Sequence, residues 1–234
     1  MSARRRWSAL LAVLAVTTAL LLPLQLLVGS LGPVTDGLAA REAEGSLWSG
    51  GLRGASWRGR PLGDLKVGLR PLPLLLGNRV FAVRGDDLSL RMLLGRRRGV
   101  EGMNASIEAL ALPELPAVDV DLRFTDVALV FADGRCTRAE GRVQASLRWA
   151  GREDVATVLS GTPECAERAM VLPLRADGGT PRIQAELRLE ADGRYRLHAV
   201  VGDADPTAAA LLRQSGFVDA PGGLSRSIDG RLAD

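Results

Sequence analysis

The chain has 234 residues, of which 47% are hydrophobic, 24% charged and 4% aromatic, and its formal net charge is +3. This length and apolar fraction predict a folded domain with a substantial core and exclude a wholly disordered chain. One histidine and two cysteines exclude a zinc finger or a multi-histidine metal centre. We therefore expect neither a metal nor a cofactor.

An uncharged apolar segment lies near the start of the chain. Residues 7–31 are dominated by Leu, Ala and Val, and about 20 apolar residues suffice to cross a bilayer as a helix. The arginines at 4–6 precede this segment, so the positive-inside rule places residues 1–6 in the cytoplasm and residues 32–234 in the periplasm. A cleaved signal peptide is the alternative, but the apolar run is long for one and the only nearby cleavage candidate, Val28-Gly29-Ser30, is poor. We expect an uncleaved, single-pass inner-membrane anchor.

The positive charge is not concentrated on the predicted folded domain. Without Arg4–Arg6, the remaining 27 Lys and Arg residues balance the 27 Asp and Glu residues. The one internal cluster, Arg96-Arg97-Arg98, lies between Gly95 and Gly99 and is typical of a solvated turn, with an anionic partner such as phosphate or lipid headgroups as the alternative. We expect no nucleic-acid partner.

Period-two alternation of apolar and polar residues predicts antiparallel strands with one apolar and one wetted face. The predicted strands cover residues 62–69, 80–83, 88–92, 118–131, 143–149, 183–189, 195–201 and 224–232. Asp-Gly pairs at 133–134 and 192–193 separate such runs and predict hairpin turns, and Asp126 marks a bulge. The glycines between Gly45 and Gly59 predict bends and bulges between strands.

One helix interrupts the strands. Asp205 is a suitable N-cap, Pro206 fits the first turn, and Gly216 is a suitable stop. The predicted fold is mainly β: one transmembrane helix, then a curved antiparallel sheet, built as a partly open barrel or a sandwich, with one short helix near residues 206–215.

No pattern of residues indicates catalysis. The single histidine, His198, falls on the polar phase of its strand, and Ser160 lies in an expected loop without a G-x-S-x-G motif. Asp119 and Asp121 share the polar face of a strand, which a solvated surface explains. We therefore expect a non-enzyme with no catalytic or cofactor-binding residue and no small-molecule substrate.

Cysteines and tryptophans are the most informative single residues. Cys136 and Cys165 lie in the segment expected in an oxidising compartment, where an even count predicts a disulfide; two independent buried thiols are the alternative. Trp48 and Trp57 follow the membrane segment, and they fit either a core or a surface that contacts a partner or the membrane. We treat these two tryptophans as a candidate interaction surface.

Short motifs in a fixed order resemble the type II secretion system protein N family. They include Gly45-Ser46-Leu47-Trp48-Ser49-Gly50, the Pro71–Val80 stretch, Asp133-Gly134-Arg135-Cys136, Gly161-Thr162-Pro163-Glu164-Cys165 and Gly230-Arg231-Leu232. The family tends to carry a tryptophan before the Pro-Leu stretch, where this chain reads Val67-Gly68-Leu69.

The resemblance implies an accessory inner-membrane component of the machinery that exports folded periplasmic proteins through an outer-membrane secretin. Its partners would be other secretion proteins (platform, secretin or pseudopilus components) and the lipid bilayer. The resemblance also implies a disulfide between Cys136 and Cys165.

A second function fits the same predicted fold. A membrane anchor followed by a curved antiparallel sheet is also compatible with a periplasmic carrier of phospholipid or lipopolysaccharide, because an apolar sheet face can cradle acyl chains. The alternation of the predicted strands does not distinguish this carrier from a secretion component.

Overall fold

The structure, a computed structural model, describes residues 7, 38–57, 60–75, 77–111, 118–149, 152–176, 178 and 181–232. The chain divides into two compact units, Met1–Met92 and Leu93–Asp234. The predicted tail at 1–6 and membrane helix at 7–31 lie outside the described residues, apart from Trp7. Within the described ranges, no helix has both the length and the apolar character needed to cross a bilayer.

The first unit is an antiparallel sheet with one short helix. Its elements are β1 (Leu38–Ala39), β2 (Glu42–Ser46), β3 (Ser49–Trp57), β4 (Arg60–Leu69), α3 (Pro71–Leu75), β5 (Arg79–Arg84) and the start of β6 (Leu88–Leu94). β3 pairs with β4 along one edge, and with β2 and β1 along the other. Leu52, Ala55 and Leu65 form the centre of its core.

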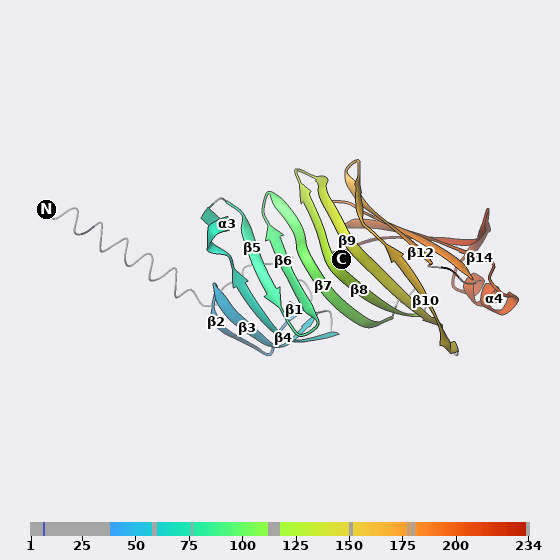
Figure 1. Cartoon of the computed structure of the whole chain (residues 1–234), viewed down its shortest axis with the longest axis horizontal. Helices are drawn as coiled ribbons and strands as arrows, with labels where there is room; N and C mark the ends of the chain where they lie inside the picture. Colours follow the sequence, from blue (N-terminus) through green and yellow to red (C-terminus); the bar gives the residue numbers. More distant parts are fainter. Residues whose placement is uncertain are drawn as a thin grey trace. The chain divides into compact units, whose positions relative to one another are not determined.

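The second unit is a larger antiparallel sheet with a helix near its C-terminal end (Figure 1). Its strands are β7 (Arg97–Ala111), β8 (Val118–Ala132), β9 (Arg135–Trp149), β10 (Arg152–Gly161), β11 (Glu164–Ala166), β12 (Ala169–Ala176), β13 (Arg182–Leu189), β14 (Arg194–Gly202), β15 (Val218–Ala220) and β16 (Gly223–Arg231). The strand order is β7-β8-β9-β10-β12-β13-β14-β16-β15, with β11 paired to β12. Neighbouring strands are thus mostly consecutive in the chain, in one open sheet rather than the two stacked layers of a sandwich.

The predicted turns and bulge are confirmed. β8 and β9 meet at Asp133-Gly134, and both residues have positive φ (49° and 73°), as a tight hairpin turn requires. The register of β8 shifts between Thr125 and Ala128, where Asp126 has φ 48°. A Cβ at Gly141 on the facing strand would lie 2.5 Å from the carbonyl oxygen of Asp126, so glycine is needed opposite this bulge.

The predicted helix is α4 (Pro206–Gln214). The Asp205 carboxylate accepts hydrogen bonds from the backbone N–H groups of Thr207 (3.0 Å) and Ala208 (2.9 Å). Gly216, with φ 85°, follows the C-cap Ser215. These are the N-cap and left-handed C′ positions expected from the sequence.

Several elements of the structure were not predicted from the sequence. β7, β10, β11, β12 and the β2–β3 hairpin were not predicted, and the expectation of a loop at Ser160-Gly161 was wrong, because both residues end β10. A Cβ at Gly161 would lie 2.0 Å from the carbonyl oxygen of Pro173, so this glycine permits close strand approach. The predicted turn at the arginine cluster is a bend at Gly95 and Arg96, followed directly by β7.

Candidate functional site

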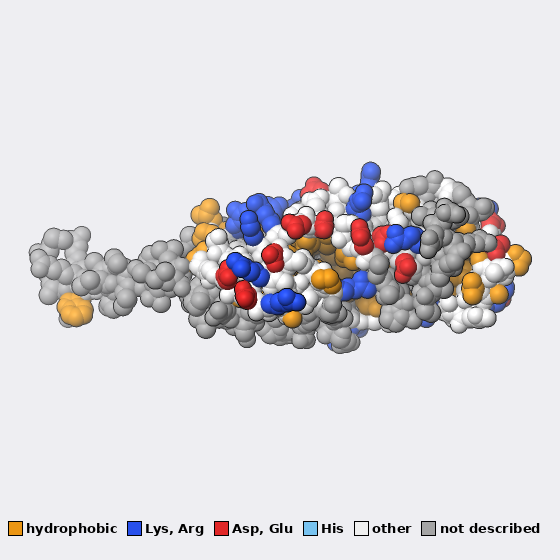
Figure 2. All heavy atoms as spheres, turned by 90° about the horizontal axis from the view of Figure 1, so that it is seen from below, with side chains coloured by type: hydrophobic (Ala, Val, Ile, Leu, Met, Phe, Trp, Pro, Cys, Tyr) orange, Lys and Arg blue, Asp and Glu red, His pale blue; other side chains and the backbone are white. Residues whose placement is uncertain are grey.

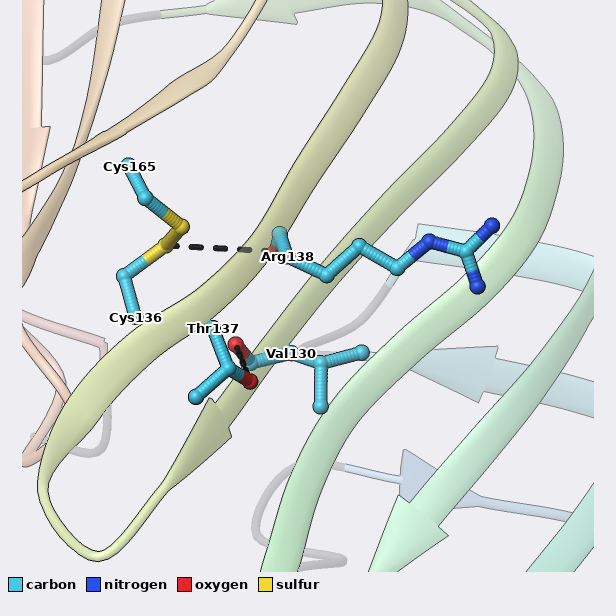
Figure 3. Close-up of a disulfide and its surroundings, with 5 residues drawn as sticks. All are labelled: Val130, Cys136, Thr137, Arg138 and Cys165. Carbon is cyan, nitrogen blue, oxygen red and sulfur yellow. Dashed lines mark hydrogen bonds between the residues drawn. A yellow bond between two sulfur atoms is a disulfide. The ribbon is translucent and has the colours of Figure 1, made fainter.

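A disulfide joins Cys136, in β9, to Cys165, in β11, with Cα atoms 5.4 Å apart (Figure 3). Cys136 is buried, and its Sγ lies 3.9 Å from the carbonyl oxygen of Arg138. The backbone N–H of Cys136 donates to the carbonyl oxygen of Arg168 (3.1 Å) in the turn after β11. The short β11–β12 hairpin is therefore tied to β9 by a covalent bond and a hydrogen bond.

Trp48 lies in the two-residue turn between β2 and β3. Ser46 and Ser49 face each other across the turn, and the backbone N–H of Leu69 donates to the carbonyl oxygen of Leu47 (2.9 Å). A Cβ at Gly68 would lie 2.5 Å from the carbonyl oxygen of Trp48, so the turn packs on β4 where a side chain is absent. The G-x-L-W-x-G motif thus builds a hairpin that holds Trp48 at one end of β3.

A shallow pocket of about 400 Å³ lies beside Trp48. Gly68 and Ala82 are paired across β4 and β5 and contribute to its lining, as do the cations Lys66, Arg70 and Arg84. Lys66 and Arg84 are directly opposed, an arrangement in which like charges repel. Among the described residues, no acidic side chain forms an ion pair with any of these three cations. The pocket is therefore suited to an anionic partner.

Trp57 lies at the other end of β3 and is 45% exposed. Trp57 is the ninth and last residue of β3, which begins directly after Trp48, and this spacing corresponds to roughly 30 Å at about 3.3 Å per residue. The structure therefore does not bring Trp48 and Trp57 into one patch. The candidate surface of the first unit is centred on Trp48 and its pocket.

The outer face of the second unit is polar and contains paired charges. The carboxylate of Asp121 binds Arg148 through both oxygens, at 2.8 and 3.1 Å. His198 is exposed, with Nδ1 2.9 Å from Oγ of Ser227 on the next strand. On the face drawn in Figure 2, acidic and basic side chains are similarly interspersed. Asp121 and His198, both considered as catalytic groups, thus pair with side chains of neighbouring strands.

The shifted pKa values also reflect surface pairing. A hydrogen bond from the backbone N–H of Arg194, together with the charges of Arg194 and Arg231, lowers the pKa of the Asp192 carboxyl. A hydrogen bond to Glu140 raises the pKa of the Arg138 guanidinium. Both groups lie at exposed strand or turn positions, where such pairing stabilises the charged form.

The second unit also contains an apolar hollow of about 270 Å³. Its lining comes from β8, β9, β10, β12, β13 and β14, together with Leu212 of α4 and Phe217. Since four strands separate β8 from β14 in the sheet order, these strands share a hollow only because the sheet curls. Among the described lining residues there is no charged or amide side chain, and Tyr195 is the most polar.

Three small side chains contribute to the lining of the hollow. Ala185 and Ala199 are paired across β13 and β14, between the bulkier pairs Ile183–Val201 and Leu187–Leu197. Ala145 of β9 also lines the hollow. This site was not predicted; the small residues Ala185 and Ala199 on the apolar faces of two predicted strands are the signal that could have indicated it.

The hollow is partly open to solvent, so part of its apolar lining is in contact with water. An apolar group that fills the hollow would remove this surface from water, which is favourable.

Comparison with known proteins agrees with the resemblance seen in the sequence. The family model described as type II secretion system (T2SS), protein N, matches residues 36–226. The chain is 28% identical, over 238 residues, to the type II secretion system protein N of Vibrio cholerae serotype O1 (strain ATCC 39315 / El Tor Inaba N16961), covering 92% of this chain and 91% of that protein. No solved structure matches the chain significantly. The family match includes the Trp48 hairpin, both cysteines and most of the described strands, and the chain therefore belongs to the type II secretion system protein N family.

Proposed function

We propose that this chain is a non-catalytic accessory component of the type II secretion machinery in the inner membrane. The observation that carries this proposal is the family match over residues 36–226. In this proposal, residues 1–6 are cytoplasmic, residues 7–31 form the single membrane helix, and residues 32–234 form the periplasmic domain. The uncharged segment after three arginines supports that topology, and a disulfide fits an oxidising periplasm.

The Trp48 pocket is the proposed contact with another secretion component. Its three cations lack an acidic partner among the described residues, so an acidic segment would complement them. Trp48 supplies a large side chain with an apolar body and a polar N–H, a residue type enriched at binding hot spots. Trp57 lies at the opposite end of β3 from Trp48, so a crosslink at Trp57 provides a matched control for a crosslink at Trp48.

The test is site-specific photocrosslinking in secreting cells. The photoreactive amino acid p-benzoylphenylalanine replaces Trp48 or Trp57 in the full-length chain, and the crosslinked proteins are identified by mass spectrometry. We expect inner-membrane or periplasmic secretion proteins to crosslink at position 48 more strongly than at position 57.

Charge reversal tests the electrostatic part of the proposal. Lys66→Glu combined with Arg84→Glu should abolish the crosslink at position 48, whereas Arg175→Glu, on an exposed position of β12, should preserve it. An absence of secretion proteins among the crosslinked products at both tryptophan positions would contradict the proposed role.

A further inference from the structure

The hollow of the second unit has the properties of a binding site for hydrocarbon. It is lined by residues of six strands and by Leu212 of α4, its described lining is apolar, and its volume is about 270 Å³. The Ala185–Ala199 pair places two small side chains at matched positions in its lining. We propose that this hollow binds one lipid acyl chain, a property that does not depend on the secretion role.

A peptide is a poor occupant of this hollow. An extended peptide would bury backbone N–H and C=O groups that need hydrogen-bond partners, and the strands around the hollow already pair their own backbones. The described lining offers no charged or amide side chain in their place. A helical peptide satisfies its own backbone, but its diameter of about 10–12 Å is too great for this volume.

An acyl chain meets each of these constraints. It has no hydrogen-bonding group along its length, and its thin, flexible shape can follow a narrow hollow between sheet strands. The polar headgroup of the lipid stays in water outside the hollow. The charged side chains of the unit likewise lie on its solvent-exposed outer face. Contact with Phe124 on β8 and Leu187 on β13 would bury the chain between strands that are not neighbours.

The first experiment places a photoreactive group inside the hollow. In intact cells, p-benzoylphenylalanine replaces Phe124, which lines the hollow, or Arg123, its exposed neighbour on the opposite face of β8. After irradiation, the full-length chain is purified and its intact mass is measured. We expect a lipid-sized adduct at position 124 at least tenfold more abundant than at position 123. A phospholipid mass identifies the bilayer as the source and a fatty-acid mass identifies a free pool, and both support the site.

The second experiment fills the hollow. Ala185→Phe should lower the adduct at position 124 at least tenfold, whereas Gln184→Phe, on the exposed face of the same strand, should preserve it. Ala199→Leu is a milder filling variant, and its melting temperature shows whether the unit still folds. In a true hollow this variant keeps or raises the melting temperature and weakens the adduct.

Three outcomes would overturn the proposal. They are no adduct at position 124, equal adducts on both faces, and an adduct to a peptide, including a segment of this chain. A melting temperature lowered by Ala199→Leu in a chain without adduct would likewise indicate an ordinary packed core.

Discussion

Loss of the Cys136–Cys165 disulfide should destabilise the second unit by a predictable amount. The cysteines are 29 positions apart, and the chain-entropy relation gives about 3.6 kcal/mol for a loop of roughly 30 residues. In a domain of this size, each kcal/mol shifts the melting temperature by about 2–4 °C. We therefore expect reduction to lower the melting temperature by about 7–14 °C.

The assay compares oxidised and reduced full-length chain in the same detergent by thermal circular dichroism. Alkylation of the exposed thiols after unfolding verifies that both cysteines were reduced. The matched variant is Cys136→Ala with Cys165→Ala, chosen because a serine hydroxyl at the buried position 136 would add its own desolvation cost. This variant should melt like the reduced chain and should not respond to reductant.

Two results would refute the reasoning. One is an unchanged melting temperature in fully reduced wild-type chain, which would mean that the hydrogen bond from the Cys136 N–H and the surrounding packing already fix the β11–β12 hairpin. The other is a response to reductant in the double-alanine variant, because that effect could not come from this disulfide.

Three further predictions concern the elements around the hollow. Gly141→Ala should destabilise the chain by about 1–3 kcal/mol in urea unfolding, more than Gly134→Ala, because both glycines have positive φ but only Gly141 has backbone within 3 Å of the added Cβ. Asp205→Ala should cost about 1 kcal/mol by the same measurement, because it removes the N-cap of α4. The lowered pKa of Asp192 means that its stabilisation is present above the ordinary carboxyl pKa and is lost as the pH falls through the lowered pKa. Asp192→Asn should therefore make the melting temperature less dependent on pH across that acidic range.

Local signals predicted the parts of the fold that depend on neighbouring residues. The α4 cap is fixed within three residues of Asp205. The hairpin at Asp192-Gly193 is closed by local backbone hydrogen bonds of Glu190 with Gly193 and Arg194. The bulge at Asp126 was likewise visible as an interruption of the alternation. In each case the physical cause is contained in a short segment, so one sequence suffices to predict it.

Strands without clear alternation were missed because their stability comes from pairing. β12 contains Pro173, which removes one backbone donor, and β10 ends in a glycine that allows the approach of β12. The β2–β3 hairpin is rich in glycine, which disfavours regular strands in isolation. Its pairing with β4, where Gly68 leaves room for the turn, supplies the missing stabilisation.

The hollow is the part of the candidate site that lies furthest from sequence prediction, and the reason is specific. A two-residue turn at Asp192-Gly193 would pair Ala185 with Val200, whereas the observed register pairs Ala185 with Ala199, so the sequence alone does not locate the thin region of this hairpin. Whether that thin region is filled by an opposing layer or left as a hollow depends on β8 and β9, which contribute Phe124 and Ala145 from more than 30 residues away. Period-two alternation is the same for a filled region and for a hollow, because it indicates only which face of a strand is apolar. The sizes of the side chains at positions that face each other across the sheet decide whether this region is a packed core or a binding site. For this reason, the Ala185→Phe and Ala199→Leu variants test lipid binding and core packing together.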